Sequence, residues 1–268
     1  MQTSVQLYTV REPLVADFGG TLQRLADIGF TAVEAFDFVG TADVVDTGDT
    51  GDAPAAVEET DATDKAQRYA QALKAAGLIA PSGHAHLVGQ DITAAFDAAE
   101  IVGVKTVIEP MVRDDKWATA EDAVRIAESL NAAAKVAALR GLRVGYHNHN
   151  WELATKYDGV PALEFLAQHL DPEVVLELDL YWAWVGGVDP VGLLERLGER
   201  VQLVHVKDGP TGGGLDAQIP AGTGDVPLRA ALAAAPWLDL AIVEFDVYGG
   251  DIFDGVTNSL RWLEAATG

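Results

Sequence analysis

VGYHNHNWE (144–152) is a strand-like run of apolar residues that ends in ionisable side chains. Three later runs share this form: VVLELDLYW (174–182), VQLVHVKDG (201–209) and LAIVEFDVY (240–248). Each has the aliphatic and β-branched residues of a strand buried on both faces, and a helical pattern follows it. In a closed barrel of parallel strands, the C-terminal strand ends meet at the face that carries the chemistry. The four runs therefore predict an α/β barrel with a site at that face.

The ionisable residues at the ends of these runs can meet in one place although they are far apart in the sequence. They are His147, His149, Glu152, Asp179, His205 and Glu244. A structural role explains any one of them, since Asp179 can cap the following turn and His205 can be a core histidine. It explains poorly why all of them occupy equivalent strand positions. We therefore interpret the chain as an enzyme.

Strand-like and helix-like segments alternate along all 268 residues. The predicted strands are 4–10, 32–38, 78–86, 105–111, 143–149, 174–182, 201–207 and 240–246. The predicted helices include 64–77, 92–103, 119–141, 189–197, 226–235 and 252–266. Eight strand–helix repeats predict one (β/α)8 TIM-barrel domain over residues 1–268. A doubly wound open sheet is the alternative, but no GxGxxG motif follows the first strand.

The segment 41–63, TADVVDTGDTGDAPAAVEETDAT, has no strand or helix periodicity. It is rich in Asp, Gly and Thr and falls where the second βα loop is expected. We predict an acidic loop insertion at the rim of the active face. The spacing of its acidic residues does not match a calcium-binding loop that ends in a bidentate Glu.

The composition of the chain limits the classes of molecule that it is expected to bind. The net charge of −23 disfavours nucleic acid and anionic membranes, because such a surface repels phosphate groups. The chain has no cysteine, which excludes thiolate metal sites. Its N-terminus lacks a basic, then apolar leader, and no run approaches 18 apolar residues, so we expect a cytoplasmic protein. The oligomeric state stays open, a homo-oligomer included.

Asp179, His205 and Glu244 form the strongest part of the pattern. One imidazole with several carboxylates makes a mostly oxygen site, which suits Mn²⁺, Mg²⁺ or Co²⁺. We expect one divalent metal, with Mn²⁺ as the first choice.

At this point the chain resembles the sugar phosphate isomerase/epimerase superfamily, with a xylose isomerase-like barrel. That group also includes ketose 3-epimerases, inosose dehydratases and abasic-site endonucleases. The similar segments are GFTAVEAF (29–36), HNHNWE (147–152), LELDLYWAWVGGVDP (176–190), VHVKDG (204–209), IPAGTGDVP (219–227) and IVEFD (242–246). The resemblance implies a metal held by a Glu on strand five and by Asp179, His205 and Glu244 on strands six to eight. An endonuclease is disfavoured because it needs a basic face for DNA.

Strand five departs from the family pattern. His147 stands where the ligating Glu is expected, and Glu152 follows five residues later. Either Glu152 reaches back to the metal, or His147 is the ligand and Glu152 contacts substrate. We favour Glu152, because it preserves the charge of a site with two Glu and one Asp.

The expected function is a divalent-metal-dependent sugar isomerase or epimerase. A metal that binds a carbonyl and an adjacent hydroxyl stabilises the enediolate left when the α-proton departs. Glu244 on one side, with Glu152 or His149 on the other and His147 assisting, can move that proton. Lys207 can stabilise an oxyanion or protonate a leaving hydroxyl, although a salt bridge to Asp208 or Glu177 explains it equally well.

Two other functions remain open. A dehydratase or lyase acting on an inosose or a 3-keto-glycoside shares the same first step. A non-catalytic sugar-binding protein is the alternative from another class.

A small sugar or cyclitol is the expected substrate, because aromatic rings beside carboxylates suit a sugar ring. The expected substrate contacts are Glu34, His84, His86, Trp182 and Trp184. The GPTGGG segment (209–214) after strand seven could bind a phosphate through backbone N–H groups, although few basic residues are near it.

Overall fold

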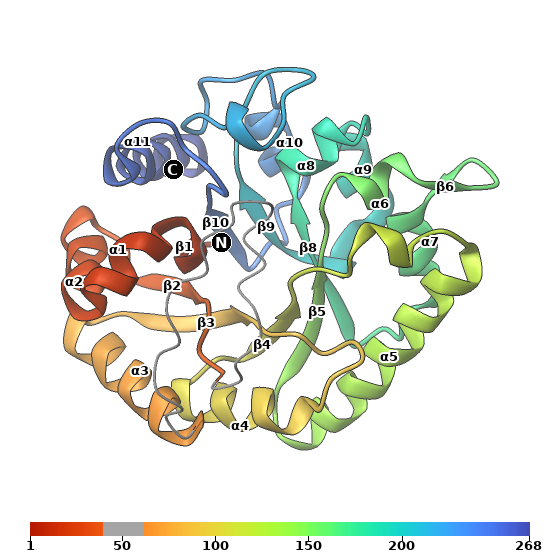
Figure 1. Cartoon of the computed structure of the whole chain (residues 1–268). Helices are drawn as coiled ribbons and strands as arrows, with labels where there is room; N and C mark the ends of the chain where they lie inside the picture. Colours follow the sequence, from red (N-terminus) through yellow and green to blue (C-terminus); the bar gives the residue numbers. More distant parts are fainter. Residues whose placement is uncertain (40–61) are drawn as a thin grey trace.

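The computed structural model describes residues 1–39 and 62–268, and these form a closed barrel of eight parallel strands. Around the barrel the order is β1-β10-β9-β8-β5-β4-β3-β2, so neighbours in sequence are neighbours in space. Helices surround the strands, and the C-terminal helix lies beside the N-terminal ones (Figure 1). The predicted barrel is therefore confirmed. Its strands are β1 (Gln2–Gln6), β2 (Ala32–Ala35), β3 (Ile79–His84), β4 (Thr106–Glu109), β5 (Arg143–His147), β8 (Val174–Asp179), β9 (Val201–Val206) and β10 (Leu240–Val243).

The helices begin where the sequence offers caps. Thr119 and Asp122 form a capping box at the start of α5, and Asp189 caps α9 ahead of a proline in its first turn. The helices are α1 (Arg11–Ala16), α2 (Phe18–Ile28), α3 (Ala62–Ala76), α4 (Ile92–Val102), α5 (Ala120–Leu139), α6 (Trp151–Ala154), α7 (Ala162–His169), α8 (Leu180–Val185), α9 (Pro190–Leu197), α10 (Leu228–Ala234) and α11 (Ile252–Thr267). Short 3-10 helices are η1 (Leu7–Val10), η2 (Asp114–Lys116), η3 (Gly198–Arg200) and η4 (Leu215–Ala217), and β6 (Lys156–Tyr157) pairs antiparallel with β7 (Val160–Pro161).

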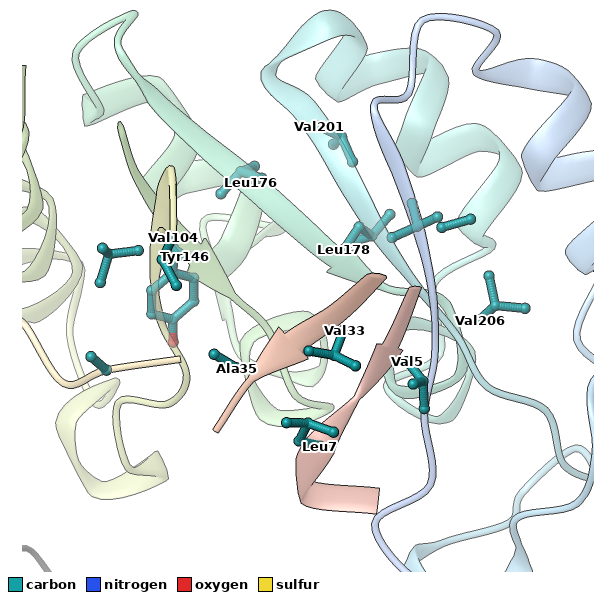
Figure 2. Packing of buried hydrophobic residues seen from close by; sticks show 14 of the residues in the cluster. Val5, Leu7, Val33, Ala35, Val104, Tyr146, Leu176, Leu178, Val201 and Val206 are labelled. Carbon is teal, nitrogen blue, oxygen red and sulfur yellow. The ribbon is translucent and has the colours of Figure 1, made fainter. Parts of the chain in front are cut away.

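The apolar core has two parts because strand side chains alternate between two faces. Outward-facing side chains such as Leu176, Leu178 and Tyr146 are buried between barrel and helices (Figure 2). A smaller cluster fills the barrel interior and comprises Ile108, Val175, Leu203, Leu240 and Ile242. Gly145 makes room for it, because a Cβ there would collide with the Ile108 side chain. On β8, β9 and β10 these interior residues come before the polar ones in the sequence. The apolar cluster therefore lies on the N-terminal side of the polar residues inside the barrel.

All eight predicted strands extend past the observed strand ends, and two of them run into a helix. The strand expected at 4–10 ends at Gln6, because Leu7–Val10 forms η1. The strand expected at 174–182 ends at Asp179, whose side chain caps α8. In both cases the apolar residues continue from the strand into the helix that follows it. The apolar pattern alone therefore does not show where the strand ends. The predicted helices named above do not include α1, α2, α6, α7 or α8.

The predicted acidic loop at 41–63 lies mostly outside the described residues. Its last two residues, Ala62 and Thr63, already belong to α3. Among the helices of residues 1–39 and 62–268, none is both long and apolar enough to cross a membrane.

Candidate metal and proton-transfer site

Strand register brings the site together at the C-terminal end of the barrel. Asp179, the last residue of β8, is paired with His205 on β9, and His147, the last residue of β5, is paired with Glu177 on β8. Glu244 follows β10 directly. All five side chains are buried. They form two groups that share His205.

The outer group comprises Asp179, His205 and Glu244, whose potential ligand atoms all lie within 4.8 Å of one another. His205 Nδ1 is 2.8 Å from Glu244 Oε2 and 4.0 Å from Asp179 Oδ2. The two oxygens of Asp179 differ in role. Oδ1 accepts a hydrogen bond from the backbone N–H of Trp182, whereas Oδ2 has no hydrogen-bond partner.

Lys207 places a positive charge against this group. Its Nζ lies 3.0 Å from Asp179 Oδ2, 2.5 Å from Glu244 Oε2 and 2.6 Å from Asp246 Oδ2. Asp246 also accepts hydrogen bonds from Trp182 Nε1 and Gln218 Nε2, so the anchor of the lysine is itself fixed. The alternative explanation of Lys207, a salt bridge to Asp208 or Glu177, is wrong in its partners, which are Asp179, Glu244 and Asp246.

The inner group lies behind His205 and comprises Glu34, His84, His147, Glu177 and His205. His205 Nε2 is 2.8 Å from Glu34 Oε2 and 3.2 Å from Glu177 Oε2. His84 Nε2 contacts the same two oxygens at 3.2 and 2.7 Å. His147 Nδ1 is 3.1 Å from Glu177 Oε2, and its Nε2 is 3.9 Å from Asp179 Oδ2. The ring of His147 therefore spans the two groups.

Charge in the inner group is balanced by protons. Burial alone would lower the pKa of His84, but Glu34 and Glu177 raise that pKa to about 10. Burial would likewise raise the pKa of Glu177, and Glu34 adds to this, yet His205 and His84 bring it down to about 2. Burial and the neighbouring His205 lower the pKa of His147 well below its usual range, so this imidazole is neutral.

In the outer group the two carboxylates differ. Burial raises the pKa of Asp179 against the opposing charge of Lys207. For Glu244, the charges of Lys207 and His205 outweigh burial and hold the pKa well below its ordinary value. The four carboxylates of the two groups and that of Asp246 outnumber three positive side chains, Lys207, His84 and His205, so the centre attracts cations.

The structure does not bring Glu152 into either group. Its carboxyl group accepts hydrogen bonds from the Tyr146 hydroxyl at 2.6 Å and from the backbone N–H of His149 at 3.0 Å. Tyr146 belongs to the cluster between barrel and helices, and the next residue, His147, faces the barrel interior because side chains alternate along a strand. The partner of Glu152 therefore lies on the other side of the barrel wall. Burial raises the pKa of Glu152 to about 8 despite these donors.

His149 lies at the rim with aromatic neighbours. Its ring stacks on Trp151, with centroids 4.5 Å apart, and lies 6.2 Å from the Trp182 ring. Burial lowers the pKa of His149 to about 4, and its Nδ1 is buried without a hydrogen-bond partner. This imidazole is therefore neutral and has an unused nitrogen that can accept a proton, while its low pKa makes it a weak base.

The predicted substrate contacts are spread over different places. Glu34 and His84 belong to the inner group, and Trp182 packs against the outer one. Trp184 is partly buried against the core, with an unpartnered Nε1. His86 is 2.8 Å from Glu109 and lines a pocket of about 720 Å³.

Sequence reasoning missed Glu177 and Asp246 as members of the site. The available signal was their spacing: Glu177 precedes Asp179 by two residues and Asp246 follows Glu244 by two, which places each pair on one face of an extended chain.

The loop after β9 is organised around Asp208. Its carboxylate accepts four backbone N–H bonds, from Gly209, Gly222, Gly224 and Val226, at 2.8 to 3.2 Å. This buried carboxylate joins the glycine-rich segment 209–214 to the segment 219–227.

Comparison with known proteins agrees with this architecture. The family model described as a xylose isomerase-like TIM barrel matches residues 22–266. The chain belongs to this family. A sugar phosphate isomerase/epimerase from Parabacteroides distasonis ATCC 8503 has the family fold with a TM-score of 0.79 and 25% sequence identity, covering 99% of this chain and 94% of that one. The IOLI protein, whose crystal structure contains a zinc atom, shares the fold at 14% identity, with a TM-score of 0.67 and coverage of 99% and 98%.

Curated relatives match over part of the chain. An inosose dehydratase from Geobacillus kaustophilus (strain HTA426) is 32% identical over 96 residues, 35% of this chain and 28% of that protein. One from Salmonella typhimurium is 30% identical over 101 residues, 37% of this chain and 31% of that protein. The matched region thus spans less than a third of either relative.

Proposed function

We propose that the protein is a divalent-metal-dependent isomerase or epimerase that removes a proton next to the carbonyl of a small sugar or cyclitol. The observation that carries this proposal is the outer group, in which two carboxylates and an imidazole from three strands converge at the C-terminal end of the barrel. The family and the structural likeness to a sugar phosphate isomerase/epimerase support the same class of reaction.

The residues of the outer group fit a metal. Asp179 Oδ2 is buried without a hydrogen-bond partner, and the ammonium of Lys207 already shows that a cation is favoured against it. His147 is the fourth ligand in our proposal, since its Nε2 faces Asp179 and Glu152 is held elsewhere. Carboxylate oxygens with imidazole nitrogens suit Mn²⁺, with Mg²⁺, Co²⁺ or Zn²⁺ as alternatives. A bound divalent ion supplies Lewis acidity toward a substrate carbonyl.

Different side chains around the outer group remove and return the proton in our proposal. Glu244 is charged and lies on one side, and the neutral His149 offers its Nδ1 on the other. Lys207 donates a proton or a hydrogen bond to the oxygen that gains charge. Glu152 acts through His149, whose backbone it holds. Trp182, Trp184 and His86 are the proposed substrate contacts.

A second candidate is a dehydratase or lyase acting on an inosose or a 3-keto-glycoside. It is favoured by the similarity to inosose dehydratases and by Lys207, which can protonate a departing hydroxyl. Both candidates begin with the same proton removal, so the difference is whether a leaving group sits next to the carbanion.

The test follows solvent deuterium into the substrate. The wild-type protein with Mn²⁺ is incubated in D₂O with keto sugars, inososes and 3-keto-glycosides, and mass spectrometry detects exchange and product. We expect exchange next to the carbonyl, reduced at least about a hundredfold in Glu244→Gln because a base is lost. The control is Glu199→Gln, an exposed carboxylate of η3 ahead of β9 at the opposite end of the barrel. Equal exchange in Glu244→Gln and wild type would refute the role of Glu244, and binding of a sugar without any exchange would favour a sugar-binding protein.

A further inference from the structure

The inner group contains enough ligand atoms to resemble a second metal site. Nitrogens of His84, His147 and His205 and an oxygen of Glu177 lie within 4.8 Å of one another. Two of these histidines, His147 and His205, also face the outer group through their other ring nitrogen. The inner group therefore either holds its own ion or supports the rings that serve the outer one.

The chemistry of imidazole separates these two roles. A neutral imidazole has one nitrogen with a free lone pair and one that carries a proton. If His205 gives its Nδ1 lone pair to a metal in the outer group, its Nε2 must carry the proton and donate it. That nitrogen lies 2.8 Å from Glu34 Oε2, at hydrogen-bond distance. A metal at the same Nε2 would require a doubly deprotonated ring.

The carboxylates that receive these protons are themselves fixed. Glu34 Oε2 accepts a hydrogen bond from Gln6 Nε2 at 2.7 Å, and Gln6 is in turn held by the backbone N–H of Tyr8. His84 Nε2 lies between Glu34 and Glu177 and contacts both. All of these side chains are buried or nearly so, which limits their freedom to rotate.

We infer that Glu34 and Glu177 are positioning residues, which hold His205 and His147 with Nδ1 and Nε2, respectively, turned toward the outer group. Glu34 receives the proton on His205 Nε2. The negative charge of Glu177 Oε2, 3.1 Å from His147 Nδ1 but outside hydrogen-bond geometry, favours a proton on that nitrogen. The inference rests on the proposed function, because it assumes a metal in the outer group. A carboxylate behind a ligating histidine orients the ring and raises its basicity, and its removal weakens metal binding by about 10- to 100-fold.

The experiment measures proton location and metal affinity separately. Long-range ¹H–¹⁵N spectra of the metal-free protein report which ring nitrogen of each histidine carries a proton. We expect the single proton of His147 on Nδ1 and a proton on His205 Nε2. In the metal-free protein His205 Nδ1 is protonated as well, because, against its burial, Glu177 and Glu244 raise the pKa of this histidine well above its usual range. Titration with Mn²⁺ alone should give one ion per chain, bound about 10- to 100-fold more weakly in Glu34→Gln and Glu177→Gln than in the wild type. Alanine variants should bind still more weakly, because glutamine keeps an oxygen acceptor.

Glu109→Gln is the matched control. Glu109 is also a buried carboxylate at a strand end next to a histidine, but it faces His86 and lies outside both groups. Its affinity for Mn²⁺ should stay within about twofold of the wild type. Two bound ions, one of them lost in Glu177→Gln, would show a second metal site and overturn the inference, as would a proton on His147 Nε2 in the metal-free protein. If no Mn²⁺ binds but the proton locations are as expected, the proposed function fails while the orientation of the rings stands.

Discussion

Glu152 is a buried carboxyl group whose protonation is coupled to folding. Its pKa is near 4.5 when exposed and about 8 in the folded protein. Between these values the folded chain holds a proton that the unfolded chain has lost, so this group makes the free energy of unfolding fall as pH rises. The slope is at most about 1.4 kcal/mol per pH unit. Below pH 4.5 and above pH 8 it adds no further change.

Glu152→Gln should remove this slope. Glutamine has nearly the same volume and can still accept from His149 N–H and pair with the Tyr146 hydroxyl. We expect the variant to gain stability relative to the wild type as pH rises from 5 to 8, measured by urea unfolding at several pH values. Glu199→Gln, at an exposed position, should follow the wild-type curve. A constant difference between wild type and Glu152→Gln would show that Glu152 is ionised throughout this range.

Asp179 joins two elements, because it ends β8 and caps α8. Asparagine is as good a cap as aspartate, whereas alanine is not. We expect Asp179→Asn to keep the cap and to bind Mn²⁺ much more weakly, while the metal-free protein loses only the contribution of the ion pair with Lys207. Asp179→Ala should lose metal binding and a further 1 kcal/mol or so of stability, through the lost cap. Thermal unfolding with EDTA and titration with Mn²⁺ measure the two effects. If Asp179→Asn binds Mn²⁺ as the wild type does, Asp179 is only a cap.

The same element shows what the sequence could and could not predict. The barrel followed from repeated apolar runs, and the proximity of Asp179, His205 and Glu244 followed from their positions at strand ends. Their role as metal ligands stays a prediction. The end of β8 could not be predicted from the sequence, because residues Leu180–Val185 are still mostly apolar although they form the helix α8. The position of Glu152 could not be predicted either. Its separation of five residues from His147 does not reveal that the outward-facing Tyr146 hydrogen-bonds to it.

At the scale of the whole molecule, charge is the dominant feature. Asp and Glu number 41 against 18 Lys and Arg, so the folded chain repels itself. Raising NaCl from about 10 mM to 500 mM shortens the Debye length from about 30 Å to a few ångström. We expect the melting temperature, measured with EDTA present, to rise by several degrees and then level off as screening is completed. A melting temperature that is constant or falls over this range would mean that the acidic side chains are already neutralised by their neighbours.

The hydrogen bonds of Asp208 in the loop after β9 affect whether this loop can bind a phosphate group. Four backbone N–H groups of this loop, one in 209–214 and three in 219–227, already donate hydrogen bonds to Asp208, which lies two residues after the end of β9. A tethered ligand is present at an effective concentration in the millimolar range or above, whatever the solution contains. A phosphate would have to displace the Asp208 carboxylate from these amides and would then be repelled by its negative charge. We therefore expect these four amides not to bind the phosphate of a phosphorylated sugar, because Asp208 already occupies them.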